Sequence, residues 1–149
     1  MKRTFCILLV AVLMLSLAAC GTANSGKQTA SAYLDQAEEA PVEVTVDLSG
    51  GWSVEFVRGA AYFYDSEITD TNEGVAMLLT LDKEVYEEYL TEAMADDNRK
   101  ETDEGVYFTS DGGESGYLTS VNDSAYVLIT SDKTDVEATV ARVTLALAS

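Results

Sequence analysis

Residues 75–95 read VAMLLTLDKEVYEEYLTEAMA, and this stretch decides the fold class. Residues 75–81 are apolar on both faces, as in a central strand that is covered on two sides. Asp82 can then cap a helix in which apolar residues recur at helical spacing with glutamates opposite. These apolar residues are Val85, Tyr86, Tyr89, Leu90, Ala93 and Met94. Asp96 and Asp97 are unfavourable at the carboxyl end of a helix, so we expect the helix to stop there.

The segments on either side of this stretch predict further strands. Residues 42–48 alternate apolar and polar, which indicates a strand with one buried face. Residues 52–57 and 60–64 predict a hairpin with a tight two-residue connection. After the helix, we expect strands at residues 106–109, 116–121 and 125–130. The turns between them, at residues 111–113 and at Asn122 and Asp123, contain residue types that tolerate positive φ.

The last twenty or so residues allow two interpretations. Ser131 or Asp132 can cap a second helix with an apolar stripe, and that stripe consists of Val136, Val140, Val143 and Leu147. Residues 143–147 also fit a strand, but their alanine content favours the helix. The predicted order is therefore β-β-β-β-α-β-β-β-α. We expect an α+β domain with an antiparallel sheet of about six to seven strands and two helices packed on one face. In element order alone this prediction is similar to the PsbP/Mog1-like fold.

Composition excludes several classes of function. The 149 residues include 26 Asp and Glu against 9 Lys and Arg, which gives a net charge of −17. Nucleic acids are excluded as partners, because binding them requires clustered basic residues. The chain has no histidine, so Ser-His-Asp catalysis and histidine metal sites are excluded as well.

The first twenty residues predict export. Lys2 and Arg3 precede an apolar run at residues 5–19, which is typical of a secretory signal. The run is shorter than the about 20 apolar residues that span a bilayer, so a permanent transmembrane anchor is the weaker interpretation. It ends in the sequence LAAC at residues 17–20.

The LAAC sequence resembles the lipobox of bacterial lipoproteins. The resemblance implies that residues 1–19 are a lipoprotein signal peptide, that Cys20 receives a diacylglycerol through a thioether, and that the new amino terminus is acylated. More than one fatty chain, such as palmitate, gives stable anchoring. The alternative is an ordinary thiol beside a conventional signal cleavage site. We expect a protein anchored by lipid at the extracytoplasmic face of a cell membrane.

The mature chain divides into a tether and one domain. Residues 20–40 are expected to form the lipidated cysteine and a flexible linker, because among residues 21–40 only Tyr33 and Leu34 have large apolar side chains. Residues 41–149 are expected to form a single α+β domain. Cys6 leaves with the signal, so no intramolecular disulfide is possible. Loss of Lys2 and Arg3 lowers the basic residues from 9 to 7 against 26 acidic ones, a net charge of −19.

Aromatic residues supply the candidate binding site. A two-residue turn at Asn122 and Asp123 pairs Tyr117 with Leu128 and Thr119 with Tyr126, so that Tyr117 and Tyr126 share a face. Such rings suit sugars, peptides or protein partners. The full predicted ligand-binding set is Trp52, Tyr62, Tyr64, Tyr117 and Tyr126. In the alternative interpretation these rings complete the core.

Acidic clusters do not predict a metal or a cofactor. Asp65, Glu67, Asp70, Asn72 and Glu73 lie close together, but their spacing does not match an EF-hand loop. We expect a non-catalytic binding or accessory module whose partner is an envelope protein, a peptide or a cationic ligand. Two rival functions are a small hydrolase that uses a carboxylate pair and a structural or inhibitory surface protein.

Overall fold

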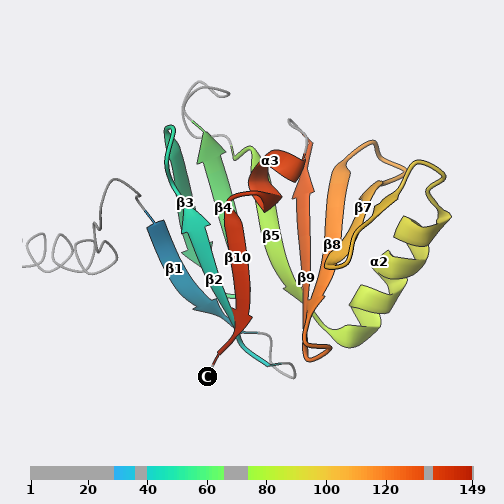
Figure 1. The fold of residues 1–149 in the computed structure, drawn as a ribbon, viewed down its shortest axis with the longest axis horizontal. Helices are drawn as coiled ribbons and strands as arrows, with labels where there is room; N and C mark the ends of the chain where they lie inside the picture. The colour runs from blue at the N-terminus through green and yellow to red at the C-terminus, as the bar shows by residue number, and fades with distance from the viewer. Residues whose placement is uncertain (1–28, 36–39, 66–73, 133–135, 149) are drawn as a thin grey trace, which may run out of the picture.

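Two antiparallel sheets dominate the computed structural model, which describes residues 29–35, 40–65, 74–132 and 136–148 (Figure 1). The amino-terminal strands are β1 (Thr29–Leu34), β2 (Val42–Asp47), β3 (Trp52–Val57), β4 (Ala60–Asp65) and β5 (Ala76–Leu81). Helix α2 (Lys83–Ala95) follows, and then β6 (Lys100–Glu101), β7 (Gly105–Thr109), β8 (Ser115–Val121) and β9 (Ala125–Ser131). The described chain ends with helix α3 (Val136–Val140) and strand β10 (Val143–Leu147). The predicted α+β class with an antiparallel sheet is confirmed.

The larger sheet has seven strands in the order β3-β4-β5-β9-β8-β7-β6. β5 lies inside this sheet between β4 and β9, as its apolar residues on both faces predicted. The β3–β4 hairpin is confirmed, with Trp52 opposite Asp65 and Val57 opposite Ala60. The two-residue strand β6 had no signal in the sequence.

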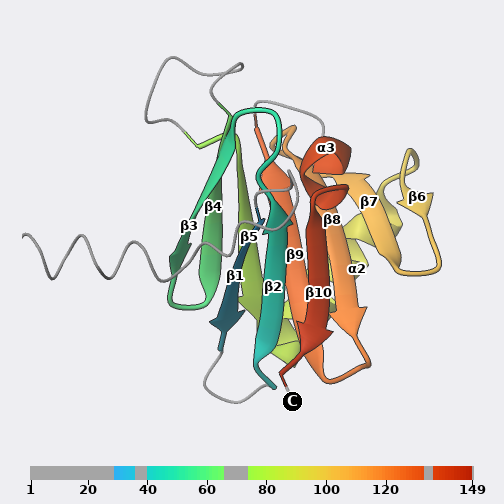
Figure 2. The same ribbon diagram turned by 60° about the vertical axis from the view of Figure 1, so that its left-hand side comes forward.

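The smaller sheet has the order β1-β2-β10 and contains two strands that the sequence did not predict (Figure 2). The prediction of a flexible linker over residues 20–40 is wrong for Thr29–Leu34, which pairs with β2 along its whole length. The hydroxyls of Ser31 and Thr45 are hydrogen-bonded at 2.9 Å, and Leu34 is only 2 % exposed. Pairing with β2 thus orders a stretch that has too few apolar residues to form a strand by itself. The predicted signal and Cys20 lie outside the described residues.

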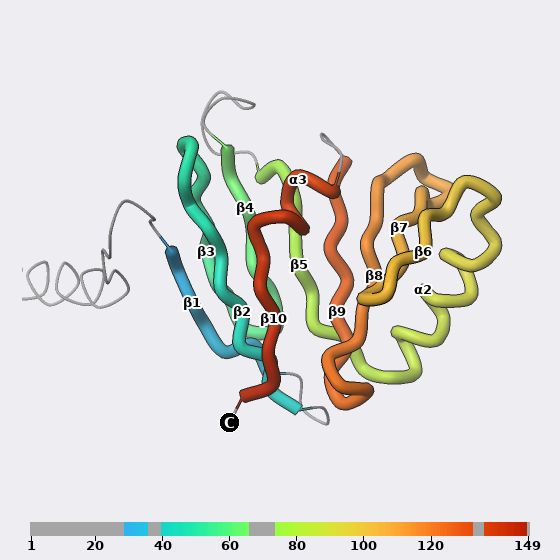
Figure 3. The backbone as a smooth tube through the Cα atoms, in the orientation of Figure 1, coloured from blue at the N-terminus to red at the C-terminus, as the bar shows by residue number. Residues whose placement is uncertain are grey.

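The prediction of a long carboxyl-terminal helix is also wrong. α3 ends at Val140, and Val143–Leu147 pairs with β2 as a strand, so the interpretation set aside for its alanine content is the correct one (Figure 3). The free side of β2 offers backbone hydrogen bonds that outweigh a weak helix propensity. The predicted apolar stripe of Val136, Val140, Val143 and Leu147 nevertheless faces one core.

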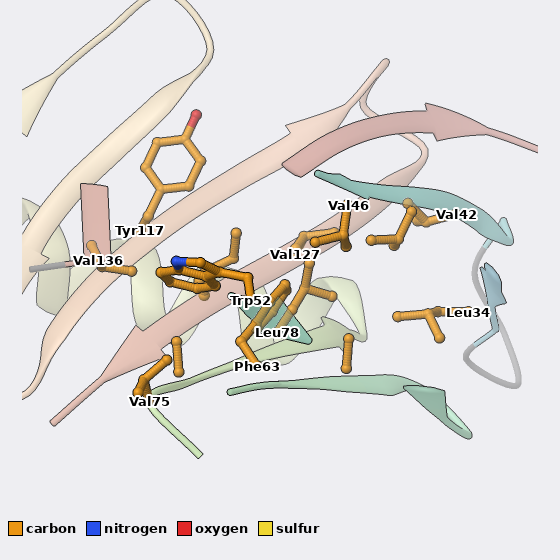
Figure 4. Close-up of a cluster of buried hydrophobic side chains, with 14 of the residues drawn as sticks. Leu34, Val42, Val46, Trp52, Phe63, Val75, Leu78, Tyr117, Val127 and Val136 are labelled. Atoms are coloured by element: carbon orange, nitrogen blue, oxygen red, sulfur yellow. The ribbon is translucent and has the colours of Figure 1, made fainter. Parts of the chain in front are cut away.

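The seven-stranded sheet carries a different core on each face. The small sheet and α3 cover one face, where Trp52, Phe63, Leu78 and Val127 are buried together (Figure 4). α2 covers β7, β8 and β9 on the other face. The expectation that both helices pack on one face is therefore wrong, since the small sheet takes the place of a second helical layer.

α2 begins and ends where the sequence predicted. The carbonyl of Asp82 accepts a hydrogen bond from the amide of Tyr86 at 2.9 Å, but the Asp82 side chain makes no capping hydrogen bond. Asp96 ends the helix, and its amide donates to the carbonyl of Ala93 at 3.3 Å.

Candidate ligand-binding cleft

The register of β8 and β9 decides where the predicted aromatic residues lie. Val121 pairs with Ala125, so the loop consists of residues 122–124 and not of a two-residue turn. Asn122 and Asp123 both have positive φ, as their residue types predicted. The longer loop shifts the pairing by one residue, which moves alternate side chains to the opposite face.

This shift separates Tyr117 from Tyr126. Tyr117 is opposite Ile129, and Tyr126 is opposite Ser120. Tyr117 is buried in the core beneath the small sheet, and its ring centroid lies 4.5 Å from that of Tyr107. Tyr126 is buried under α2 on the other face, 4.6 Å from the ring of Tyr86.

The predicted aromatic patch is therefore not one surface. Trp52 is buried between the sheets, and the guanidinium of Arg142 lies 4.6 Å from its ring. Only Tyr62 and Tyr64 remain together, on the face of β4 that is turned away from the small sheet. Tyr62 is 36 % exposed, and the Tyr64 hydroxyl donates to Glu55 at 3.3 Å. Burial raises the pKa of the Tyr64 phenol, and the Glu55 carboxylate raises it further.

A cleft of about 540 Å³ opens beside β10 instead. β10 forms one wall, β8 and β9 form the floor, and the segment before β7 forms the opposite rim. The lining residues are Asp103, Glu104, Tyr117, Thr119, Ser120, Val121, Asn122, Ile129, Val140, Val143, Thr144 and Leu145. Of the five predicted ligand-binding residues, only Tyr117 contributes to it.

Tyr117 places a phenol at the polar end of this cleft. Figure 4 shows its hydroxyl pointing out of the cluster of apolar side chains. Burial raises the pKa of the Tyr117 phenol above its ordinary value of 10.0, Thr119 and Thr102 lower it, and Glu104 raises it. The net shift is upward, so the phenol is protonated at neutral pH and can donate a hydrogen bond.

Close packing fixes the rim of the cleft against its floor. The Thr119 hydroxyl donates to the carbonyl oxygen of Glu104. Gly105 lies over Tyr117, and a Cβ atom there would be 2.8 Å from the Tyr117 ring. The absence of a side chain at Gly105 therefore leaves room for the phenol.

The charged groups of the cleft are acidic. Asp103 and Glu104 are both exposed on the rim, and no Lys or Arg is present among the described residues that line the cleft. Sequence reasoning missed these two residues because nothing distinguishes them from the other Asp and Glu residues of the chain. The short strand β6 that precedes them also has no signal in the sequence. Their place opposite β10 depends on a strand that was predicted as helix.

A second hollow of about 590 Å³ lies near the β2–β3 turn. Arg142 occupies its side and donates hydrogen bonds to the carbonyl oxygens of Ser49 at 2.7 Å and Asp47 at 3.2 Å. These hydrogen bonds already use the guanidinium to connect the β2–β3 turn to the end of α3. This hollow offers a ligand less than the cleft beside β10 does.

Acidic residues do not assemble into a metal centre within the part of the chain that the structure describes. Asp65, the first residue of the acidic cluster at residues 65–73, is buried at the end of β4. Glu67, Asp70, Asn72 and Glu73 lie outside the described residues.

Comparisons with known proteins give no match: no family model, no curated protein and no solved structure is similar to this chain. Among the described residues, no helix has the length and apolar character needed to span a membrane.

Proposed function

We propose that this protein is a lipid-anchored, extracytoplasmic binding module whose ligand enters the cleft beside β10. The observation that carries the binding role is the lining of the cleft, where the apolar side chains of Val143 and Leu145 lie beside Tyr117, Asp103 and Glu104. A concave site that combines apolar side chains with convergent polar groups is typical of a ligand site. Its acidic rim favours a cationic ligand or a basic segment of an envelope protein.

Anchoring rests on the sequence LAAC at residues 17–20, which resembles a lipobox. Because β1 begins at Thr29, only residues 21–28 separate Cys20 from the first strand. At about 3.3–3.6 Å per residue, this segment reaches roughly 30 Å at most. The tether is therefore shorter than the linker predicted from composition, and it keeps the cleft close to the membrane.

The net charge fits a cationic partner. A mature chain with 7 basic and 26 acidic residues is repelled by anionic headgroups and attracts cationic partners. A binding role is also preferred over carboxylate-based hydrolysis. The two acids of the cleft are adjacent in sequence and both exposed, whereas a general acid needs a desolvated environment that raises its pKa.

Labelling with a radioactive or alkynyl palmitate tests the anchoring. We expect label in the membrane-bound protein and none after Cys20→Ser, together with release of the variant or loss of its processing. Unchanged processing and membrane retention of the Cys20→Ser variant contradict lipidation.

Charge reversal in the cleft tests the binding role. We expect Asp103→Lys with Glu104→Lys to abolish cross-linking of a partner in intact cells, at low salt most strongly. Asp111→Lys with Glu114→Lys is the matched control, because it reverses two exposed charges at the other end of the β7–β8 hairpin. Equal loss in both double variants contradicts a site in the cleft.

A further inference from the structure

No strand of the described part of the chain pairs with the outer edge of β10. In the small sheet, β10 pairs only with β2 among the described strands, and its other side borders the cleft. The pairing is antiparallel, with Val143 opposite Val46 and Leu145 opposite Val44. One side of this strand is therefore open to a further strand.

Two hydrogen bonds show which residues of β10 turn their backbone groups toward β2, and therefore which turn them toward the outer side. The amide of Asp47 donates to the carbonyl of Arg142 at 2.9 Å, and the amide of Ala148 donates to the carbonyl of Pro41 at 3.0 Å. In an antiparallel pair, residues alternate between pointing their N–H and C=O groups at the partner strand and away from it. The even-numbered residues 142–148 thus face β2. Val143, Leu145 and Leu147 direct their donors and acceptors away from β2. Val143 and Leu145 line the cleft, and Leu147 follows them along the same edge.

Given the binding role proposed above, we infer that β10 accepts an extended basic segment of a partner protein as a fourth strand of the small sheet. A paired strand lies about 4.7–4.9 Å from its neighbour, which places it within the cleft. Its backbone completes the hydrogen bonds of Val143, Leu145 and Leu147. Its alternate side chains enter the cleft, whose lining includes the apolar residues Val121, Val140 and Leu145.

Charge selects this occupant over a second copy of the chain. Asp103 and Glu104 stand on the rim opposite β10, and no described lining residue is basic. Lys or Arg side chains of the added strand are attracted to this rim. A second copy carries the same acids and the same large negative charge, so pairing of two β10 edges is opposed by repulsion at low ionic strength.

Amide hydrogen exchange of the full-length protein, purified in detergent, measures the edge directly. In the free protein we expect rapid exchange at Val143, Leu145 and Leu147 and protection at Thr144 and Ala146, which face β2. The probe is the end-blocked peptide KVKVKVK, which alternates basic and apolar residues. We expect it to protect Val143, Leu145 and Leu147. The matched peptide EVEVEVE and the polyamine spermidine are expected to leave them unprotected.

Two sets of variants separate the backbone from the charges. Leu145→Pro removes one outward N–H while leaving the β2 ladder intact, since proline is tolerated on the free side of an edge strand. We expect it to weaken KVKVKVK binding about tenfold relative to Leu145→Ala, which removes the side chain alone. Asp103→Asn with Glu104→Gln is expected to weaken binding about five- to tenfold at low salt. Asp111→Asn with Glu114→Gln is expected to leave it unchanged.

Other outcomes overturn the inference in distinguishable ways. KVKVKVK-induced shifts at Tyr117 and Ile129 without protection of β10 would show a ligand in the cleft that is not an added strand, which leaves the proposed binding role standing. Equal binding of spermidine shows simple attraction of cations. Slow exchange at the three outward amides of the free protein, with a dimer in sedimentation, shows that a second copy covers the edge.

Discussion

The guanidinium of Arg142 lies 4.6 Å from the ring of Trp52, which is buried in the core between the two sheets. The same guanidinium donates to the carbonyls of Ser49 and Asp47. Arg142 directly precedes β10, and its side chain therefore connects this point of the chain to the β2–β3 turn and to Trp52, the first residue of β3. These contacts connect the segment between α3 and β10 to the β2–β3 turn.

Arg142→Ala is expected to destabilise the fold by about 2–4 kcal/mol, through the loss of a cation–π contact and of two hydrogen bonds by a charged donor. Arg142→Lys is expected to recover only part of this, because lysine does not reproduce the planar fork. Urea unfolding followed by fluorescence measures the effect, and Trp52, the single tryptophan of the chain, is itself the probe. A loss below about 0.5 kcal/mol for Arg142→Ala contradicts this role.

Leu34→Ala tests whether β1 belongs to the folded domain. Leu34 is 2 % exposed in the core of the small sheet, so its truncation is expected to cost about 2–5 kcal/mol. Tyr33→Ala is the neighbouring control, since Tyr33 is 65 % exposed. If both substitutions lower the melting temperature equally little, residues 29–34 belong to the tether and not to the folded domain. For the same reason, a fragment that starts at Pro41 is expected to be less stable than one that contains β1.

Gly116→Ala tests the packing of β7 on β8. A Cβ atom at Gly116 would lie 2.6 Å from the ring of Phe108, its cross-strand partner. Overpacking of this kind costs about 1–3 kcal/mol, and Phe108→Leu in the same chain is expected to restore part of the loss. Gly112→Ala, at an open position of the adjacent turn, is the control and should change the unfolding midpoint little. Independent, additive effects of Gly116→Ala and Phe108→Leu would show that the two residues do not compete for space.

Asp96 predicts a pH dependence of stability. Its carboxylate accepts the amides of Thr109 and Asn98, each at 2.8 Å. The bond from Thr109 lowers the pKa of Asp96 most, followed by that from Asn98, so the pKa lies below the ordinary 3.8. The carboxylate therefore stabilises the fold above the pKa of the unfolded chain, and this contribution is lost as the pH falls through the folded pKa.

The comparison with Asp96→Asn isolates this contribution. We expect the variant to be less stable than the unaltered protein above about pH 5, and the difference to shrink toward about pH 2. Urea midpoints measured across this range give the result. A difference that is constant with pH would assign the effect of the substitution to geometry and not to charge.

Much of the fold followed from local pattern. The alternation of residues 42–48 and the apolar run at residues 75–81 placed β2 and β5 correctly, and helical spacing after Asp82 placed α2. These segments carry enough apolar residues at one period to specify their own structure. The candidate site was much less predictable. Only Tyr117 of the five chosen aromatic residues lines the cleft. One additional residue in the β8–β9 loop moved Tyr126 to the face opposite Tyr117, and Trp52, Tyr62 and Tyr64 lie on β3 and β4, which do not line the cleft.

By itself, the sequence determined the class of the fold, the absence of imidazole chemistry, the acidic character and the lipobox-like motif at Cys20. Tertiary structure alone decided that Thr29–Leu34 and Val143–Leu147 are strands. It thereby also decided that β10 has an edge, beside Asp103 and Glu104, that pairs with no other described strand. The physical reason is the backbone of β2. Its two sides need hydrogen-bond partners, and two segments with weak preferences of their own supply them from opposite ends of the described chain.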